Sequence, residues 1–249
     1  MSKAVKSTFK RYELKYLLTR QQKEKLLVRF KEYMVPDAYG ENVLFNLYYD
    51  TPDFLLIRRS IEKPVYKEKL RVRSYGKAEK DTKVFLELKK KYKSVVYKRR
   101  ITLTQVESEQ YFKDEFELKS SQIANEINYF KKMYQGISPR VFISYHREAF
   151  FGKEDKEFRV TFDDQILWRD TDLSLCSEEG GTAILDSDNV VMEIKVANGI
   201  PLWLVEFLTE NEIYKTSFSK YGNAYKAIVK RDSETEAVEN NRGGKDYVA

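Results

Sequence analysis

Polar and apolar residues alternate with a period of two over many segments of this chain, a pattern typical of β-strands with one buried face. In KEKLRVRSYG (67–76), Lys67, Lys69, Arg71 and Arg73 occupy every second position, so an extended backbone would project all four cations from one face. The same alternation, together with β-branched and aromatic residues and polar boundaries, predicts eight strands, at residues 9–16, 42–50, 65–75, 83–91, 94–103, 139–150, 158–168 and 189–196.

Apolar residues at helical spacing lie between and after these strands. Thr19 is placed to cap the first helix, in which Leu26, Leu27 and Phe30 share a face. The predicted helices cover residues 19–33, 52–61, 104–116, 120–134, 201–208 and 221–230, the second with a proline in its first turn. Few of them could connect parallel strands, so the order of elements favours an antiparallel, β-rich α+β fold.

The domain organisation is expected to be simple. We find no internal repeat and no linker rich in proline, glycine or serine, so residues 1–232 are expected to form one domain. Residues 233–249 are polar without hydrophobic periodicity and are expected to be a disordered tail. The single cysteine excludes an intrachain disulfide. Neither a secretory signal nor an apolar run of about 20 residues is present, so a cytoplasmic protein is expected.

Charge adds to this picture through its arrangement more than through its total. The chain has 45 Lys and Arg against 39 Asp and Glu, a formal net charge of +6. On six of the predicted strands, cations recur at one parity beside only one or two acidic residues. A solvated sheet face could account for any one of these strands. Repeated on neighbouring strands, like charges would repel, so we favour a barrel that turns these faces inward around a multiply charged anion.

Residue type indicates which anion the barrel would hold. Arginine can pair with two phosphate oxygens at once, and lysine supplies a compact point charge, so the mixture suits an array of phosphates. The few carboxylates among these cations would hold a divalent metal that bridges phosphate oxygens. Glu193 is the best candidate ligand, with Glu13 and Glu87 as further candidates. The abundant tyrosine and phenylalanine are assigned to core packing rather than to stacking on nucleic acid.

Eight short segments carry a resemblance to a known family. RYELKY, KLRVRSY, FLELKKK, VYKRRI, YHREAF, RVTFD, VMEIKV and SKY follow one another across residues 8–230. In this order they resemble the polyphosphate polymerase domain of the vacuolar transporter chaperone complex and its bacterial stand-alone relatives, within the triphosphate tunnel metalloenzyme, or CYTH-like, superfamily. The resemblance implies an eight-stranded antiparallel β-tunnel wrapped by helices. It also implies transfer of the γ-phosphate of ATP to a growing polyphosphate chain, with Mn²⁺ or Mg²⁺ as cofactor.

The resemblance further implies roles for individual residues. Catalytic roles fall to Lys15, Arg71, Arg73, Lys89, Arg147, Arg159, Lys195 and Lys220. Binding of further phosphates falls to Lys69, Lys98, Arg100, Tyr145 and Ser219, and metal binding to Glu193, with Glu13 and Glu87 as further candidate ligands. ATP, polyphosphate and pyrophosphate are the expected partners, and nucleic acid is not expected. Passage of the product across a membrane would need a separate membrane protein.

Two alternatives stay open at this point. Hydrolytic and cyclase members of the superfamily carry ExExK in the first strand, whereas this chain has Arg11 at the first acidic position and keeps Glu13 and Lys15. The missing carboxylate weakens the case for a tripolyphosphatase or nucleoside triphosphatase. A non-catalytic polyphosphate-binding module is the other alternative. The single histidine, His146, has the opposite parity to Tyr145 and is expected to be a structural residue in the outer layer.

Overall fold

The sheet contains every predicted strand, although residues 9–11 of the first one lie outside the described residues. The structure, a computed structural model, describes residues 12–38, 40–93, 95–197 and 199–243. The eight expected strands are β1 (Tyr12–Thr19), β3 (Asn42–Asp50), β4 (Tyr66–Tyr75), β5 (Lys83–Tyr92), β6 (Val95–Thr104), β7 (Ser138–Gly152), β8 (Arg159–Arg169) and β10 (Asn189–Val196). The described residues add three short strands, β2 (Met34–Pro36), β9 (Thr182–Ala183) and β11 (Lys215–Thr216). The expected number of strands was too low because two or three residues are too few to show an alternation.

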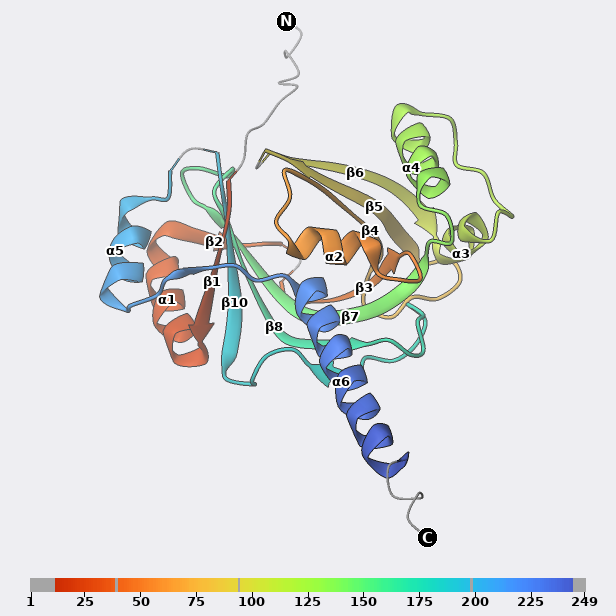
Figure 1. Ribbon diagram of the computed structural model, residues 1–249. Helices are drawn as coiled ribbons and strands as arrows, with labels where there is room; N and C mark the ends of the chain where they lie inside the picture. The colour runs from red at the N-terminus through yellow and green to blue at the C-terminus, as the bar shows by residue number, and fades with distance from the viewer. Residues whose placement is uncertain (1–11, 39, 94, 198, 244–249) are drawn as a thin grey trace, which may run out of the picture.

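All strand pairings are antiparallel, as expected. The strands are ordered β11-β1-β10-β8-β7-β3-β4-β5-β6, with β2 paired to β7 and β9 paired to β8. The sheet curves strongly, so that β1 and β10 stand across from β4, β5 and β6 (Figure 1). Within the described residues no hydrogen-bonded pairing joins β6 to β1. Instead, Lys89 on β5 contacts Glu13 on β1 at 3.2 Å (Nζ to Oε2), so side chains bridge the two sides.

Four helices pack on the convex side of the sheet. They are α1 (Arg20–Tyr33), α3 (Gln105–Phe112), α4 (Gln122–Met133) and α5 (Leu202–Glu210). Ile127 and Phe130 of α4 share one core cluster with Leu88 of β5. Leu26 of α1 and Leu204 of α5 belong to a second cluster with the apolar face of β10. Each fully buried side chain of this size contributes about 1.5–3 kcal/mol, which holds the apolar strand faces outward and the charged faces inward.

The two other helices pack against the concave side. They are α2 (Leu55–Ile61) and α6 (Lys220–Gly243), seen in front of the sheet in Figure 1. Tyr221 of α6 stacks on Tyr48 of β3, with ring centroids 4.7 Å apart. The Tyr221 hydroxyl donates to Asp50 at 2.8 Å, and the backbone N–H of Leu56 donates to the same carboxylate at 2.9 Å. This buried carboxylate therefore ties both helices to β3.

Local sequence signals predicted the first residue of one helix correctly and that of another incorrectly. Thr19 caps α1 as predicted, since its hydroxyl accepts from the backbone N–H of Gln22 at 3.1 Å. The second helix was expected from residue 52, but α2 begins at Leu55. The reason is a turn in which the N–H of Phe54 donates to the carbonyl of Thr51 at 3.0 Å and Phe54 takes a left-handed φ of 58°. The proline belongs to this turn, not to the helix.

Helix α6 is longer than expected. It runs from Lys220 to Gly243, so residues 233–243, expected to belong to a disordered tail, are helical. An i,i+4 ion pair between Lys230 and Glu234 (3.8 Å) supports the helix, and no proline interrupts it. Residues 244–249 of the expected tail lie outside the described residues. In the part of the chain that the structure covers, no helix combines the length and hydrophobicity of a membrane span.

Candidate functional site

The concave side of the sheet encloses a cavity of about 480 Å³, which we call the basic cavity. It is lined by Tyr12, Glu13, Lys15, Tyr48, Lys69, Arg71, Arg73, Glu87, Lys89, Val96, Lys98, Tyr145, Arg147, Glu193, Lys195, Ser219, Lys220 and Tyr221. Nine of these side chains are Lys or Arg, and three are glutamates. Such an excess of positive charge in a confined space is unfavourable unless an anion enters it. The cavity therefore suits a ligand that carries several negative charges.

The register of the strands explains this lining. Directly opposed residues of neighbouring strands share a face of the sheet. Lys69 on β4, Lys89 on β5 and Lys98 on β6 form one such row, and Lys15 on β1 lies opposite Glu193 on β10. A row of three lysines is unfavourable by itself because like charges on adjacent strands repel. An anion in the basic cavity would relieve this repulsion.

Glu87 on β5 anchors cations of both neighbouring strands, β4 and β6. Arg71 donates to its Oε2 through Nε (2.9 Å) and Nη2 (2.8 Å), while Lys98 (2.7 Å) and Arg100 contact its Oε1. Burial raises the pKa of Glu87, but the charges of Arg71 and Arg73 outweigh burial and hold the pKa below its usual range. Because cations engage both of its oxygens, Glu87 orients the side chains around it, and its role as a further candidate metal ligand stays a prediction.

Asp163 on β8 plays a similar part at the other side of the cavity. The buried carboxylate accepts from Arg147 through Nε (2.5 Å) and Nη2 (2.7 Å), and Lys220 at the start of α6 contacts it as well. Burial raises the pKa of Asp163, but the charges of Arg147 and Lys220 outweigh burial and lower the pKa to about 2. A two-point contact of this kind fixes the plane of a guanidinium group. Asp163 therefore orients two cations of the basic cavity.

Tyr145 on β7 is surrounded by positive charge. Its hydroxyl accepts from Nη2 of Arg73 at 2.7 Å, and Nζ of Lys220 lies 4.3 Å from the ring centroid. Burial raises the pKa of Tyr145, but the charges of Arg147, Arg73 and Lys220 outweigh burial and lower the pKa to about 8. A phenol that is more acidic than usual but still protonated at neutral pH is a good donor to a phosphate oxygen.

The pKa of Lys69 lies close to neutral pH. Burial, with the charges of Lys15 and Lys89, lowers the pKa of Lys69 to about 7. Its amino group donates to Oγ of Ser219, just before α6, at 3.0 Å. Burial also lowers the pKa of Lys98 to about 8, although the nearby carboxylate opposes this effect. A bound phosphate would favour the charged form of both lysines, because an anion stabilises a neighbouring ammonium group.

Glu13 and Glu193 are the carboxylates whose surroundings fit a divalent metal. Glu193 contacts Lys195 at 2.8 Å and Lys15 at 3.8 Å, and Glu13 contacts the same Lys15 at 3.7 Å. Burial raises the pKa of Glu193, but the charges of Lys195 and Lys15 lower it well below its usual range. Two ionised carboxylates near each other supply hard oxygen donors, which Mg²⁺ and Mn²⁺ combine with phosphate oxygens and water.

Two of the predicted lining residues do not line the basic cavity. Arg100 turns toward Glu87, as described above. Arg159 donates to Oδ2 of Asp37 at 3.3 Å and lies over the ring of Phe151, 4.8 Å from its centroid. Both have the predicted parity, but ion pairs hold their guanidinium groups, that of Arg100 against Glu87 of the cavity wall and that of Arg159 against Asp37. The remaining predicted site residues all line it.

Sequence reasoning missed five residues of the site: Val96 and Tyr221 in the cavity wall, and the three described next. Asp163 has the inward parity of its strand, but a lone aspartate gives no sign that it pairs with Arg147. Tyr48 lines the cavity, and in the sequence only the alternation along its own strand indicates this position. Tyr12 lies at the first described position of β1. The parity of a strand could have found Asp163 and Tyr48, but the emphasis on cations left them out. Tyr12 has the opposite parity to Glu13 and Lys15, so alternation does not predict its place in the cavity wall.

Comparisons with known proteins agree with this architecture. The family model described as VTC domain matches residues 10–229. A solved structure of a candidate adenylate cyclase from Bacillus halodurans is 14% identical to the chain, with a TM-score of 0.52. That alignment covers 84% of this chain and 95% of the other. At this identity the likeness concerns the fold alone.

Further solved structures are less similar. A candidate adenylate cyclase from Vibrio parahaemolyticus has a TM-score of 0.47 at 14% identity, with 88% of this chain and 98% of the other covered. A candidate adenylyl cyclase from Hippeastrum, described as having a dominant triphosphatase activity, has a TM-score of 0.48 at 14% identity, with 84% and 92% covered. No curated protein matches the chain.

Proposed function

The chain belongs to the VTC domain family, and from this premise we propose that it is a polyphosphate polymerase that transfers the γ-phosphate of ATP to a growing polyphosphate chain. One observation carries the proposal: nine cations and three glutamates line a cavity of about 480 Å³. Phosphoryl transfer asks a protein mainly to position two phosphates and to neutralise their charge. Family membership and the basic cavity support an enzyme that acts on phosphate compounds, and the polymerase is the specific form that we propose.

The arginines of the basic cavity would orient the phosphates. Glu87 holds Arg71, and Asp163 holds Arg147. Because each guanidinium group is already fixed, binding to phosphate oxygens costs it little further conformational entropy. Charge spreads over the equatorial oxygens of the transferring group, and fixed cations stabilise that charge. The proposed catalytic cations are therefore Lys15, Arg71, Arg73, Lys89, Arg147, Lys195 and Lys220, all in the cavity wall.

The lysines and the hydroxyl groups would hold the rest of the chain. Lys69 and Lys98 would take up a proton as phosphate binds, since their pKa values of about 7 and about 8 lie close to neutrality. Tyr145 and Ser219 would donate hydrogen bonds to phosphate oxygens from the end of the cavity that α6 covers. A row of such contacts tolerates chains of different length, because every phosphate unit presents the same oxygens.

Glu193, together with Glu13, would hold the proposed Mg²⁺ or Mn²⁺ cofactor. A divalent metal held there would supply positive charge that neutralises part of the phosphate charge. Lys15 and Lys195 keep the glutamates ionised before the metal enters. Neither glutamate is as heavily paired as Glu87, which already accepts from arginines on both oxygens.

Glu13 favours a second candidate function, a tripolyphosphatase or nucleoside triphosphatase of the same fold. It supplies a carboxylate near Glu193, because both lie within 3.8 Å of Lys15. A second carboxylate could orient a water molecule as the acceptor instead of a polyphosphate end. The outcome depends on which acceptor reaches the γ-phosphate.

Product analysis separates these functions. The full chain is incubated with ATP and Mg²⁺ or Mn²⁺, and the products are resolved by ³¹P NMR. Signals of internal phosphates, with ADP as co-product, would establish the polymerase. Orthophosphate alone would establish the hydrolase, and unchanged ATP would leave a polyphosphate-binding module. A cytoplasmic location, a separate membrane partner and the lack of nucleic-acid binding stay predictions.

A further inference from the structure

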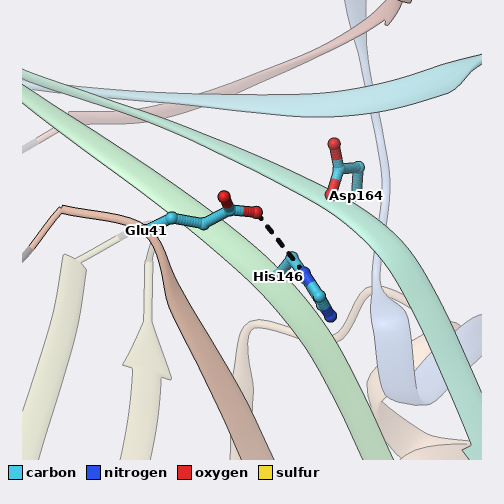
Figure 2. Close-up of side chains that lie close together, drawn as sticks. All are labelled: Glu41, His146 and Asp164. Atoms are coloured by element: carbon cyan, nitrogen blue, oxygen red, sulfur yellow. Dashed lines mark hydrogen bonds and ion pairs between the residues drawn. The ribbon is translucent and has the colours of Figure 1, made fainter.

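A second cluster of ionisable side chains lies on the side of β7 opposite the basic cavity. It consists of Glu41 just before β3, His146 on β7 and Asp164 on β8, which we call the histidine cluster (Figure 2). One ligand atom of each residue lies within 4.8 Å of the others. His146 has the parity we predicted, but it lies among carboxylates rather than in an apolar layer. This setting calls for an explanation of its own.

The backbone of β7 and β8 brings the histidine cluster together. His146 lies directly opposite Asp164, next to a shift of register between Ser144 and His146. Such bulges change the direction of the side chains beside them. Gln165, the neighbour of Asp164, has a left-handed φ of 46°, which is unfavourable for a residue other than glycine. Beside this irregularity, the amide nitrogen Nε2 of Gln165 lies 3.4 Å from Nδ1 of His146.

The two nitrogens of His146 face different carboxylates. Nε2 lies 3.3 Å from Oε2 of Glu179, and Nδ1 lies 3.4 Å from Oε1 of Glu41. If Nε2 carries the proton and donates to Glu179, the lone pair of Nδ1 faces an anionic oxygen of Glu41. Two acceptors in this arrangement repel unless a cation lies between them. Glu179 thus resembles the outer carboxylate that orients many metal-binding histidines.

We propose that the histidine cluster binds a divalent transition metal, with Zn²⁺ as the best fit. Nδ1 of His146, one oxygen of Glu41 and one oxygen of Asp164 would be the ligands, with water in the fourth position. Ligand atoms about 2.0–2.1 Å from a tetrahedral zinc lie about 3.3 Å from one another, whereas charge-assisted hydrogen bonds are about 2.7–2.9 Å long. The distance of 3.4 Å from Nδ1 of His146 to Oε1 of Glu41 fits the first geometry, and the three ligand atoms all lie within 4.8 Å of one another.

Two cations pair with Asp164 without entering the histidine cluster. Lys23 and Arg20 lie 3.7 and 3.8 Å from its Oδ2, farther than a hydrogen bond, and Lys23 makes its closer contact with Glu148. Asp164 is 8% exposed, so solvent compensates its charge poorly. A metal would neutralise the carboxylate at closer range than these two ion pairs do. Because His146 stands between Tyr145 and Arg147 in β7, a bound metal would also stiffen the strand that carries two residues of the basic cavity.

The single histidine makes a direct test possible. The full chain with Glu193→Gln, which removes the proposed metal ligand of the basic cavity, is labelled with ¹⁵N and titrated with Zn²⁺ at about pH 7.5. We expect the Nδ1 resonance of His146 to move and to saturate at one equivalent of metal. Calorimetry with the same protein should give one site, and His146→Asn should abolish it.

Variants of the other residues distinguish a built site from a lone histidine. Glu41→Gln and Asp164→Asn should each weaken Zn²⁺ binding more than tenfold, and Glu179→Gln about tenfold. Glu126→Gln, a carboxylate on α4 that pairs with Arg99, is the matched control and should leave the affinity unchanged. An Nδ1 resonance that does not respond to Zn²⁺ would overturn the proposal, as would equal affinities of the Glu41 and Asp164 variants and the unsubstituted cluster.

Discussion

Glu13 on β1 and Lys89 on β5 meet at 3.2 Å across the mouth of the concave sheet, although β1 and β5 are not hydrogen-bonded neighbours. The contact joins the two sides of the sheet through side chains. It also lowers the net charge of the basic cavity, since Glu13 is one of only three glutamates in its described lining. Glu13 therefore competes with an incoming phosphate for the same lysine.

Glu13→Gln is expected to tighten metal-free tripolyphosphate binding severalfold, because the cavity gains net positive charge. The free energy of unfolding should fall by less than about 1 kcal/mol, since the Lys89 side chain is 42% exposed and such pairs contribute little. Calorimetry without metal gives the affinity, and urea unfolding gives the stability. Weaker tripolyphosphate binding by the variant would contradict the competition that we infer.

Glu193→Ala is expected to lower the rate of phosphoryl transfer by about 100-fold or more while polyphosphate binding survives. The variant loses the proposed metal ligand but keeps every cation of the cavity wall. Rates come from ³¹P NMR and binding from calorimetry with polyphosphate. Glu126→Ala, on the outer side of β6, is the matched control and should keep the full rate. A Glu193 variant with unchanged activity would show that the metal assignment is wrong.

Polyphosphate affinity is expected to fall as the pH rises above about 7. Burial holds the pKa of Lys69 at about 7, and a bound phosphate raises it, so binding above pH 7 must take up a proton. For one such group the affinity falls by up to about tenfold per pH unit. Calorimetry in buffers of different ionisation enthalpy measures the proton uptake directly.

Lys69→Arg is the control for this pH dependence. Arginine keeps its charge throughout the range, so the variant should bind with a flatter pH profile. In the ligand-free protein, the free energy of unfolding changes with pH in the opposite direction to the affinity. The folded state binds fewer protons at Lys69 than the unfolded chain between pH 7 and 10.5, so stability should rise with pH across that window. A Lys69→Arg profile as steep as that of the native chain would contradict the assignment.

Asp163→Asn is expected to destabilise the ligand-free protein by about 3–5 kcal/mol. The substitution leaves the guanidinium group of Arg147 and the ammonium group of Lys220 buried without their carboxylate partner. Polyphosphate should restore much of the lost stability, because its oxygens can replace the missing charge. Urea unfolding with and without polyphosphate measures both effects. If the ligand stabilised the variant no more than the native chain, the proposed exchange of partners would be wrong.

Much of the basic cavity was predictable from alternation alone. Lys69, Lys89 and Lys98 lie in one row because a strand projects alternate residues to one face, and the apolar residues between them pack against helices. The same reasoning located all eight long strands and the N-cap of α1. These are properties of a residue and its near neighbours, so they are visible in the sequence.

The pairing of charges could not be predicted in the same way. Arg159 has the parity of the cavity, yet its guanidinium group turns to Asp37, which lies 122 positions away. Asp163 pairs with Lys220 of a distant helix, and Glu87 collects cations from both neighbouring strands. An ion pair depends on the distance between side chains after folding, and no periodicity reports that distance.

The sequence by itself determined the antiparallel α+β class, the strand positions, the inward direction of the cations and the family. The tertiary structure decided which cations stay free for a ligand, and it placed α2 and α6 on the concave side against Tyr48 and Asp50. It also placed Glu41, His146 and Asp164 together. The physical reason is that local conformation follows from neighbouring residues, whereas charge neutralisation and burial depend on segments that only the folded chain brings into contact.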